Sequence, residues 1–201
     1  MSDIPVKFRD VYDKPREEIV DWLREPDIQK ALRENNMYKF YDILSDKVYN
    51  QGYGGYNIGE ITNFLFSCGV NIFDYIDMIP DFCFSGLSIS HIDIPDGVSA
   101  ISSYAFEDVE KLSKIVIPGR IKYIPLGCFE NSHIDEIILE EGVEEIGPYA
   151  FSDTHYVDIY VPDSVSKIDN TAFDFTEYVH MICSEGSYAE QFAKENRVEL
   201  L

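Results

Sequence analysis

A pair of residues, one small and one phenylalanine, recurs along this chain at an almost fixed spacing. The five pairs begin at Cys83, Ala105, Cys128, Ala150 and Ala172, so the steps between them are 22, 23, 22 and 22 residues. An internal period this short is typical of a repeat array, in which each unit buries its apolar face against its neighbours. The chain should therefore fold as a stack of similar turns, and functional residues should lie on the surfaces that stacking leaves open.

Apolar residues on both sides of this pair keep the same period. Two columns precede it, and they comprise Val98, Ile121, Val143 and Val165, and Ile101, Ile124, Ile146 and Ile168. A further column follows it and comprises Ile89, Leu112, Ile134, Tyr156 and Tyr178. Next comes a short run in which apolar residues alternate, such as Ile159 and Val161 around Tyr160. Alternation with a period of two predicts a strand with one buried and one open face.

One complete unit can be read between residues 94 and 118. It opens with Ile94-Pro-Asp-Gly-Val98, continues through Ile101 and Tyr104-Ala-Phe106, and closes with Leu112, Ile115 and Ile117-Pro118. This pattern resembles the BspA-like (Treponema pallidum-type) leucine-rich repeat, and the resemblance extends over residues 79–185. It implies a leucine-rich-repeat β-solenoid of about five units of 22–23 residues each.

Three local departures from the pattern are present. Gly119-Arg120 replaces the usual pair that begins with a polar residue, Glu140 stands where proline is expected, and one extra residue lies between Phe106 and Leu112. We expect these departures to loosen individual turns without changing the register of the array.

Residues 1–78 carry helical rather than repeat patterns. Apolar residues at helical spacing predict a short helix that ends at Pro26, a second from Asp27 to about Leu44 with a kink at Asn35-Asn36, a third that starts at Asn57, and a fourth over residues 72–78. The Gly-rich segment 51–57 lacks the residues of a phosphate-binding loop. We interpret the region as a helical cap on the first repeat, since an open solenoid end exposes its core.

Residues 186–201 form the predicted C-terminal cap. Ser187 and Glu190 have the spacing of a capping box and predict a helix to about Glu195, with Tyr188, Phe192 and Ala193 facing inward. The expected fold is thus an α+β repeat protein with a helical cap (1–78), a solenoid (79–185) and a second cap (186–201). On this interpretation the chain is complete at both ends and carries no membrane, wall-anchor or catalytic domain.

Charge is the outlying property of the composition. The formal net charge is -21, of which residues 1–78 contribute -5 and residues 79–201 contribute -16. Surfaces that bind phosphate need clustered basic residues, so this balance argues against nucleic acid or an anionic membrane as a direct partner. It fits either the solubility of a solenoid or attraction to a basic partner.

Cysteine usage points to a reducing compartment. The four cysteines, Cys68, Cys83, Cys128 and Cys183, show no Cys-x-x-Cys spacing. Cys83 and Cys128 lie two units apart, beyond the roughly 7 Å that a disulfide allows between Cα atoms. With no apolar segment long enough to span a bilayer, the expectation is a cytoplasmic protein with reduced thiols.

Motifs for chemistry are not found. There is no nucleophile elbow, no His-Glu-x-x-His and no phosphate-binding loop, so we expect neither an enzyme nor a cofactor. His133 and His155 occupy equivalent positions, followed by Glu177 in the same column. Ligands on successive turns rarely converge on one ion, so no metal site is expected there.

Strand alternation places two columns of side chains on the open face, and each column forms a ladder because neighbouring strands lie about 4.8 Å apart. The apolar ladder comprises Asp93, Val116, Ile138, Tyr160 and Ile182. The charged ladder comprises His91, Lys114, Glu136, Asp158 and His180. An exposed apolar stripe is typical of a binding surface, although residues that simply favour strands would give the same pattern.

The leading hypothesis is a non-enzymatic protein-recognition module. Tyr160 and Ile138 would be its central contacts, and Asp93, Glu136 and Asp158 would favour a basic protein. One alternative is an acidic inhibitor that imitates nucleic acid, such as an anti-defence factor of a mobile element. Its acids would be Asp135-Glu136, Glu140-Glu141 and Glu144-Glu145. Self-association through the apolar stripe is another.

Overall fold

The computed structural model describes residues 16–34, 36–49, 58–67, 69–176 and 178–201. The chain divides into two compact units, one that ends at Ile76 and one that begins at Asp77. The predictions made for Asn57, Cys68, Glu177 and the Gly-rich segment 51–57 lie outside the described residues.

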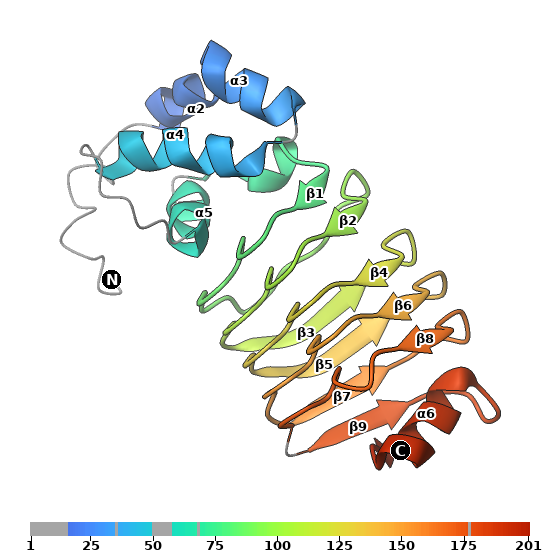
Figure 1. Ribbon diagram of the computed structural model, residues 1–201. Coiled ribbons are helices and arrows are strands. Elements are labelled where there is room, and N and C mark those ends of the chain that lie inside the picture. The colour runs from blue at the N-terminus through green and yellow to red at the C-terminus, as the bar shows by residue number, and fades with distance from the viewer. Residues whose placement is uncertain (1–15, 35, 50–57, 68, 177) are drawn as a thin grey trace. The chain divides into compact units, whose positions relative to one another are not determined.

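The first unit is helical (Figure 1). Its elements are α2 (Arg16–Leu23), α3 (Pro26–Arg33), α4 (Met37–Tyr49), α5 (Ile58–Ser67) and the 3-10 helix η2 (Ile72–Asp74). Helix α3 packs on α4, and α4 packs on α5. Their apolar faces bury Ile28, Phe40, Leu44 and Phe64 completely. The helical character expected from the periodicity is confirmed.

Some helix boundaries differ from the prediction. Pro26 is the first residue of α3, a position where the backbone N–H has no helical partner to lose. The side-chain oxygen of Asn36 accepts a hydrogen bond of 3.0 Å from the backbone N of Lys39. The expected kink is therefore a break between two separately capped helices. The helix expected over residues 72–78 is only η2, because strand β1 already begins at Met78.

The second unit is a parallel β-solenoid of about six turns with a repeat of about 22 residues, which confirms the predicted fold class. Its larger sheet runs in the order β10-β9-β7-β5-β3. These strands are β3 (Leu112–Ile117), β5 (Ile134–Leu139), β7 (Val157–Tyr160), β9 (Val179–Ile182) and β10 (Glu199–Leu200). Shorter strands form a second side of each turn: β1 (Met78–Ile79), β2 (Ala100–Ile101), β4 (Tyr123–Ile124), β6 (Glu145–Ile146) and β8 (Lys167–Ile168). Figure 1 shows both sides stacked along the array.

The recurring phenylalanine forms the centre of the core. Phe84, Phe106, Phe129 and Phe151 are completely buried, and each ring stacks on the next at centroid distances between 5.0 and 5.5 Å. The small residue before each phenylalanine is completely buried as well, so a larger side chain there would have to displace close-packed neighbours. The dipeptide period is thus the period of a continuous aromatic stack.

Each turn around the phenylalanine uses residues with a left-handed backbone. Examples are Tyr104 (φ 57°) with Asp108 (φ 54°) and Tyr149 (φ 53°) with Asp153 (φ 54°). The intervening N–H groups bond to the next turn, as the N–H of Phe129 does to the carbonyl of Ala150 at 2.8 Å. Tyrosine rarely adopts this conformation, so a left-handed backbone could not be predicted at these positions.

Two of the three departures from the repeat pattern, Gly119-Arg120 and Glu140, make close contacts with neighbouring turns, contrary to the expected loosening. A Cβ on Gly119 would lie 1.8 Å from the carbonyl oxygen of Glu141, so only glycine fits there. Arg120 donates hydrogen bonds to the carbonyls of Val98, Ile94 and Pro95 at 2.8, 2.9 and 2.7 Å. The N–H of Glu140 bonds to the carbonyl of Ile117 at 2.9 Å, a bond that proline could not form.

Helix α6 (Tyr188–Asn196) follows the last turn, and β10 then extends the larger sheet. The Ser187 hydroxyl accepts from the N–H of Glu190 at 3.1 Å, as the capping spacing predicts. Ala189, Phe192 and Ala193 are buried, whereas Tyr188 is exposed, so its predicted inward orientation is wrong. Of the helices described, none combines the length and apolar character that a membrane crossing needs.

Candidate functional site

The charged ladder exists as a row of paired side chains on the open face of the larger sheet. Lys114, Glu136, Asp158 and His180 occupy matching positions on four adjacent strands, and Glu199 on β10 continues the row. The Lys114 Nζ lies 3.2 Å from a Glu136 carboxylate oxygen. His180 Nδ1 lies 2.8 Å from Asp158 Oδ1, and its Nε2 lies 3.8 Å from Glu199 Oε2. The acids of this row therefore already have partners.

The apolar ladder lies beside the charged one. Val116, Ile138, Tyr160 and Ile182 are direct neighbours on strands β3, β5, β7 and β9. Tyr160 is 37% exposed, and the other three side chains are half-buried. The predicted stripe is thus present, with Tyr160 as its most accessible member.

His91 and Asp93 do not join the ladders. Residues 89–97 form no strand, and no described backbone hydrogen bond joins them to β3. His91 Nε2 instead lies 3.0 Å from Asp93 Oδ2. A groove of about 430 Å³ separates this segment from β3 and is lined by Lys114 and Arg120 among others. Arg120 donates hydrogen bonds to the carbonyls of Ile94 and Pro95 at the end of this segment.

Two exposed rings that share a sequence column with buried residues form a surface stack. Leu112 and Ile134 are buried, but Tyr156 and Tyr178 are 64% and 48% exposed, and their rings stack at 4.6 Å. In β7 and β9 the residues that point inward are Val157 and Val179, one position later. This shift turns the two tyrosines outward.

His133 and His155 also meet at the surface. Their rings lie 4.6 Å apart and nearly perpendicular, at 78°. Within the described part of the chain, no three His, Cys, Asp or Glu side chains are grouped so that they could hold a metal ion. The two imidazoles therefore form an exposed edge-to-face contact.

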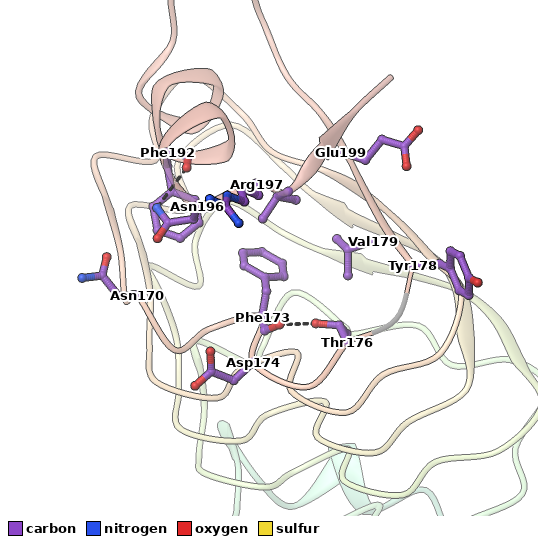
Figure 2. Close-up of a pocket in the computed structure, with 11 residues that line it drawn as sticks. Asn170, Phe173, Asp174, Thr176, Tyr178, Val179, Phe192, Asn196, Arg197 and Glu199 are labelled. Atoms are coloured by element: carbon purple, nitrogen blue, oxygen red, sulfur yellow. Dashed lines mark hydrogen bonds between the residues drawn. The ribbon is translucent and has the colours of Figure 1, made fainter.

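A pocket of about 360 Å³ lies at the C-terminal end of the solenoid. Figure 2 shows the ring of Phe173, the last of the recurring phenylalanines, pointing into it below Phe192 and Arg197. The two rings lie 6.1 Å apart at an angle of 50°, so the parallel stack ends here. On the side of the pocket away from Phe192 and Arg197, the Thr176 hydroxyl donates a hydrogen bond to the Phe173 carbonyl. Sequence reasoning missed this pocket because it depends on how α6 packs.

A second aromatic contact lies on the turn side, by which we mean the surface around the residues just before each small–phenylalanine pair. There the rings of Phe82 and Tyr104 stack nearly parallel, with centroids 5.1 Å apart. Both precede the small residue of the recurring pair, as Tyr149 does two turns later. This surface was not among the sequence predictions. A repeated aromatic residue at one position could have revealed it.

The repeats of this chain are similar to those of a known protein family. Residues 56–180 match the family model described as BspA type leucine rich repeat region, in 6 copies. The match starts before the predicted residue 79 and includes α5. A comparison with curated protein sequences found no match.

Among solved structures, the chain is similar to "The Crystal structure of Pneumococcal vaccine antigen PcpA", with a TM-score of 0.50 and 24% sequence identity. The similar region covers 56% of this chain and 29% of that one, so it spans less than a third of the longer protein and shows the fold alone. Because the family model matches more than half of the residues, the chain belongs to the BspA-type leucine-rich-repeat family.

Proposed function

We propose that this protein is a non-enzymatic recognition module that binds a protein partner through the open face of the larger sheet. Leucine-rich repeats are generally protein-binding and typically non-enzymatic. The observation that carries the proposal is the apolar ladder, in which Val116, Ile138, Tyr160 and Ile182 lie side by side on four adjacent strands. Apolar and aromatic anchors of this kind supply most of the affinity of protein interfaces.

A basic partner fits the charge of this unit, but not chiefly through the charged ladder. Glu136 and Asp158 are already close to Lys114 and His180, and Asp93 lies apart from the sheet. The net charge of -16 over residues 79–201 would instead attract a basic protein at long range. Electrostatics would then raise the association rate, while the apolar ladder would hold the complex together.

The test compares a double variant with a single control variant in a pull-down from the native cell. Tyr160→Ser with Ile138→Ser should remove the captured protein, whereas the exposed Tyr123→Ser on the other sheet should not. Circular dichroism and thermal unfolding would check that both variants fold. Equal capture by both variants would rule out the strand face as the binding surface.

Imitation of nucleic acid is the second proposal, and three ion pairs weigh against it. Glu136, Glu144 and Glu145, three of the acids assigned to it, lie within 3.2 Å of lysines on adjacent turns. The affinity of such an inhibitor for its target would fall steeply with added salt, and DNA would compete for the target.

Self-association through the apolar ladder is a different possibility. It would appear as a concentration-dependent mass in sedimentation, and the Tyr160→Ser, Ile138→Ser variant would remove that dependence.

A further inference from the structure

An aromatic row lies on the turn side of the solenoid, on residues that precede the small–phenylalanine pair. It consists of Phe82, Tyr104 and Tyr149, and the first and last are each 38% exposed. All three adopt a left-handed backbone, with φ between 53° and 58°. Gly127 holds the same position in the turn between the two tyrosines, at φ 57°. Since glycine or asparagine meets this backbone at less cost, folding alone does not explain why two exposed aromatic side chains and the half-buried Tyr104 stand here.

Two glutamates accompany the row. Glu107 and Glu130 each follow the phenylalanine of their pair. A Cβ on Gly127 would come within 2.3 Å of the Tyr104 ring and 2.9 Å of a Glu130 carboxylate oxygen, so ring and carboxylate meet above that glycine. Burial and then the charges of Glu130 and Glu107 raise the pKa of Tyr104. The rings and the acids therefore belong to one continuous surface.

The acids of this surface lack the cations that pair with acids elsewhere. On the other sides of the solenoid Glu136, Glu144 and Glu145 lie close to Lys114, Lys122 and Lys167. Among the described residues, no lysine, arginine or histidine forms an ion pair with Glu107, Glu130 or Asp153. Burial, Glu107 and Asp153 together raise the pKa of Glu130. A partner that brings positive charge would relieve this repulsion.

We propose that the aromatic row, with Glu107 and Glu130, is a second binding surface that takes an arginine-bearing segment of a basic protein. A guanidinium group is planar, so it stacks on an aromatic ring and at the same time pairs with a carboxylate through two hydrogen bonds. Ring and carboxylate lie together at Tyr104, Gly127 and Glu130. Lysine, a compact point charge, gains less from such a surface. This surface is separate from the strand face and goes beyond the function proposed above.

The first test measures binding of a fluorescent octa-arginine peptide by anisotropy, with octa-lysine as the comparison. Glu107→Gln with Glu130→Gln should weaken octa-arginine binding about tenfold, since two charge-assisted contacts are lost. The matched control is Glu144→Gln with Glu145→Gln, which changes the net charge equally on a side where both acids have lysine partners. Equal weakening in both pairs would overturn the proposal, because it would show only general attraction to an acidic protein.

The second test separates stacking from charge. Tyr104→Asn with Tyr149→Asn keeps a residue that tolerates the left-handed backbone and should also weaken octa-arginine binding about tenfold. The matched control is Tyr156→Asn with Tyr178→Asn, which removes the other exposed tyrosine pair and should leave binding unchanged. The proposal would be wrong if octa-lysine bound as tightly as octa-arginine or if the control pair weakened binding equally.

A third measurement uses the unaltered protein and so does not depend on how the variants fold. Titration of octa-arginine should shift the backbone amide NMR signals of residues 82–84, 104–107, 127–130 and 149–151. Shifts centred on residues 114–116 and 158–160 would assign the peptide to the strand face and overturn the proposal. Partner capture through the strand face should in turn persist in the Tyr104→Asn, Tyr149→Asn variant, which keeps the two proposals distinguishable.

Discussion

The strand face is the open face of the larger sheet, and the turn side is the surface around the residues that precede each small–phenylalanine pair. Both surfaces come from the same repeat, yet their charged side chains are arranged differently. On the strand face, Lys114 and His180 lie against Glu136 and Asp158 on neighbouring strands. On the turn side, burial and the charges of Glu107 and Asp153 raise the pKa of Glu130, and no described cation forms an ion pair with Glu107 or Glu130. A regular backbone thus carries one surface whose acids lie against lysine or histidine, and another where Glu107 accepts a hydrogen bond from the Ser85 hydroxyl and no described cation pairs with the acids. On the two proposals above, the strand face would use its apolar residues for recognition, and the turn side would use charge and stacking.

The largest expected effect tests the core that both surfaces share. Replacing the fully buried Phe129 with alanine removes the middle ring of the stack and should cost about 3–5 kcal/mol of unfolding free energy. Urea unfolding measures this loss. Phe175→Ala, at an exposed phenylalanine, should change stability by less than about 0.5 kcal/mol. A similar loss in both variants would show that the stack does not carry the stability of the array.

Gly119, two residues after the end of β3, tests whether the two surfaces can be disturbed separately. Gly119→Ala forces a Cβ against the Glu141 carbonyl and should cost about 2 kcal/mol or more, by moving one turn against the next. Gly97→Ala, where nothing lies within 4 Å, should have little effect. NMR shifts in Gly119→Ala should be large near the Lys114–Glu136 pair and small at Tyr149. Equal shifts at both places would mean that the surfaces are not independent.

On the strand face, His180 lies between acids of two neighbouring strands. His180→Ala removes its contacts to Asp158 and Glu199 and should cost about 1 kcal/mol. The loss should appear as faster amide hydrogen exchange in β10, which rests on β9. Lys122→Gln removes a more exposed pair with Glu144 and should cost less than about 0.5 kcal/mol. Unchanged exchange in β10 would show that His180 does not help to hold that strand.

The smallest expected effect has the opposite sign. The pKa of Glu130 is raised in the folded state, so folding favours its protonated form, and stability falls as pH rises from the usual glutamate value through the raised one. Glu130→Gln removes this loss of unfolding free energy. The variant should therefore be slightly more stable than the wild type at pH values above the raised pKa of Glu130, but not at pH values below the usual glutamate pKa. Urea unfolding at pH 4 and pH 7 checks this. Glu144→Gln, which breaks a pair with Lys122, should instead be slightly destabilising at pH 7.

The 22-residue period predicted the structural features that all turns of the solenoid share. The buried phenylalanine column and the neighbours from Lys114 to His180 and from Val116 to Ile182 follow from spacing and strand alternation alone. A period of two fixes which side chains share a face, and a period of 22 fixes which become neighbours. This is why the strand register could be predicted without coordinates.

Features of single turns could not be predicted in the same way. His91 and Asp93 lie outside the ladders because residues 89–97 form no strand, although their spacing matches that of the later strands. The outward turn of Tyr156 and Tyr178 did leave a sign, since Val157 and Val179 replace Asp135 at that position. The terminal pocket depends on how Phe192 meets Phe173, which only helix packing decides.

The tilted contact between Phe173 and Phe192 also determines where this array can change in length. The Phe192 ring lies at 50° to the Phe173 ring, so it offers no parallel surface on which another phenylalanine could stack, and the aromatic stack ends there. Inside the array the rings are nearly parallel, as those of Phe129 and Phe151 are. A duplicated turn inserted between Phe129 and Phe151 would find the same neighbours on both sides. It would lengthen both surfaces by about 4.8 Å and leave the terminus intact. Reach along a partner could thus vary by duplication while the ends stay the same.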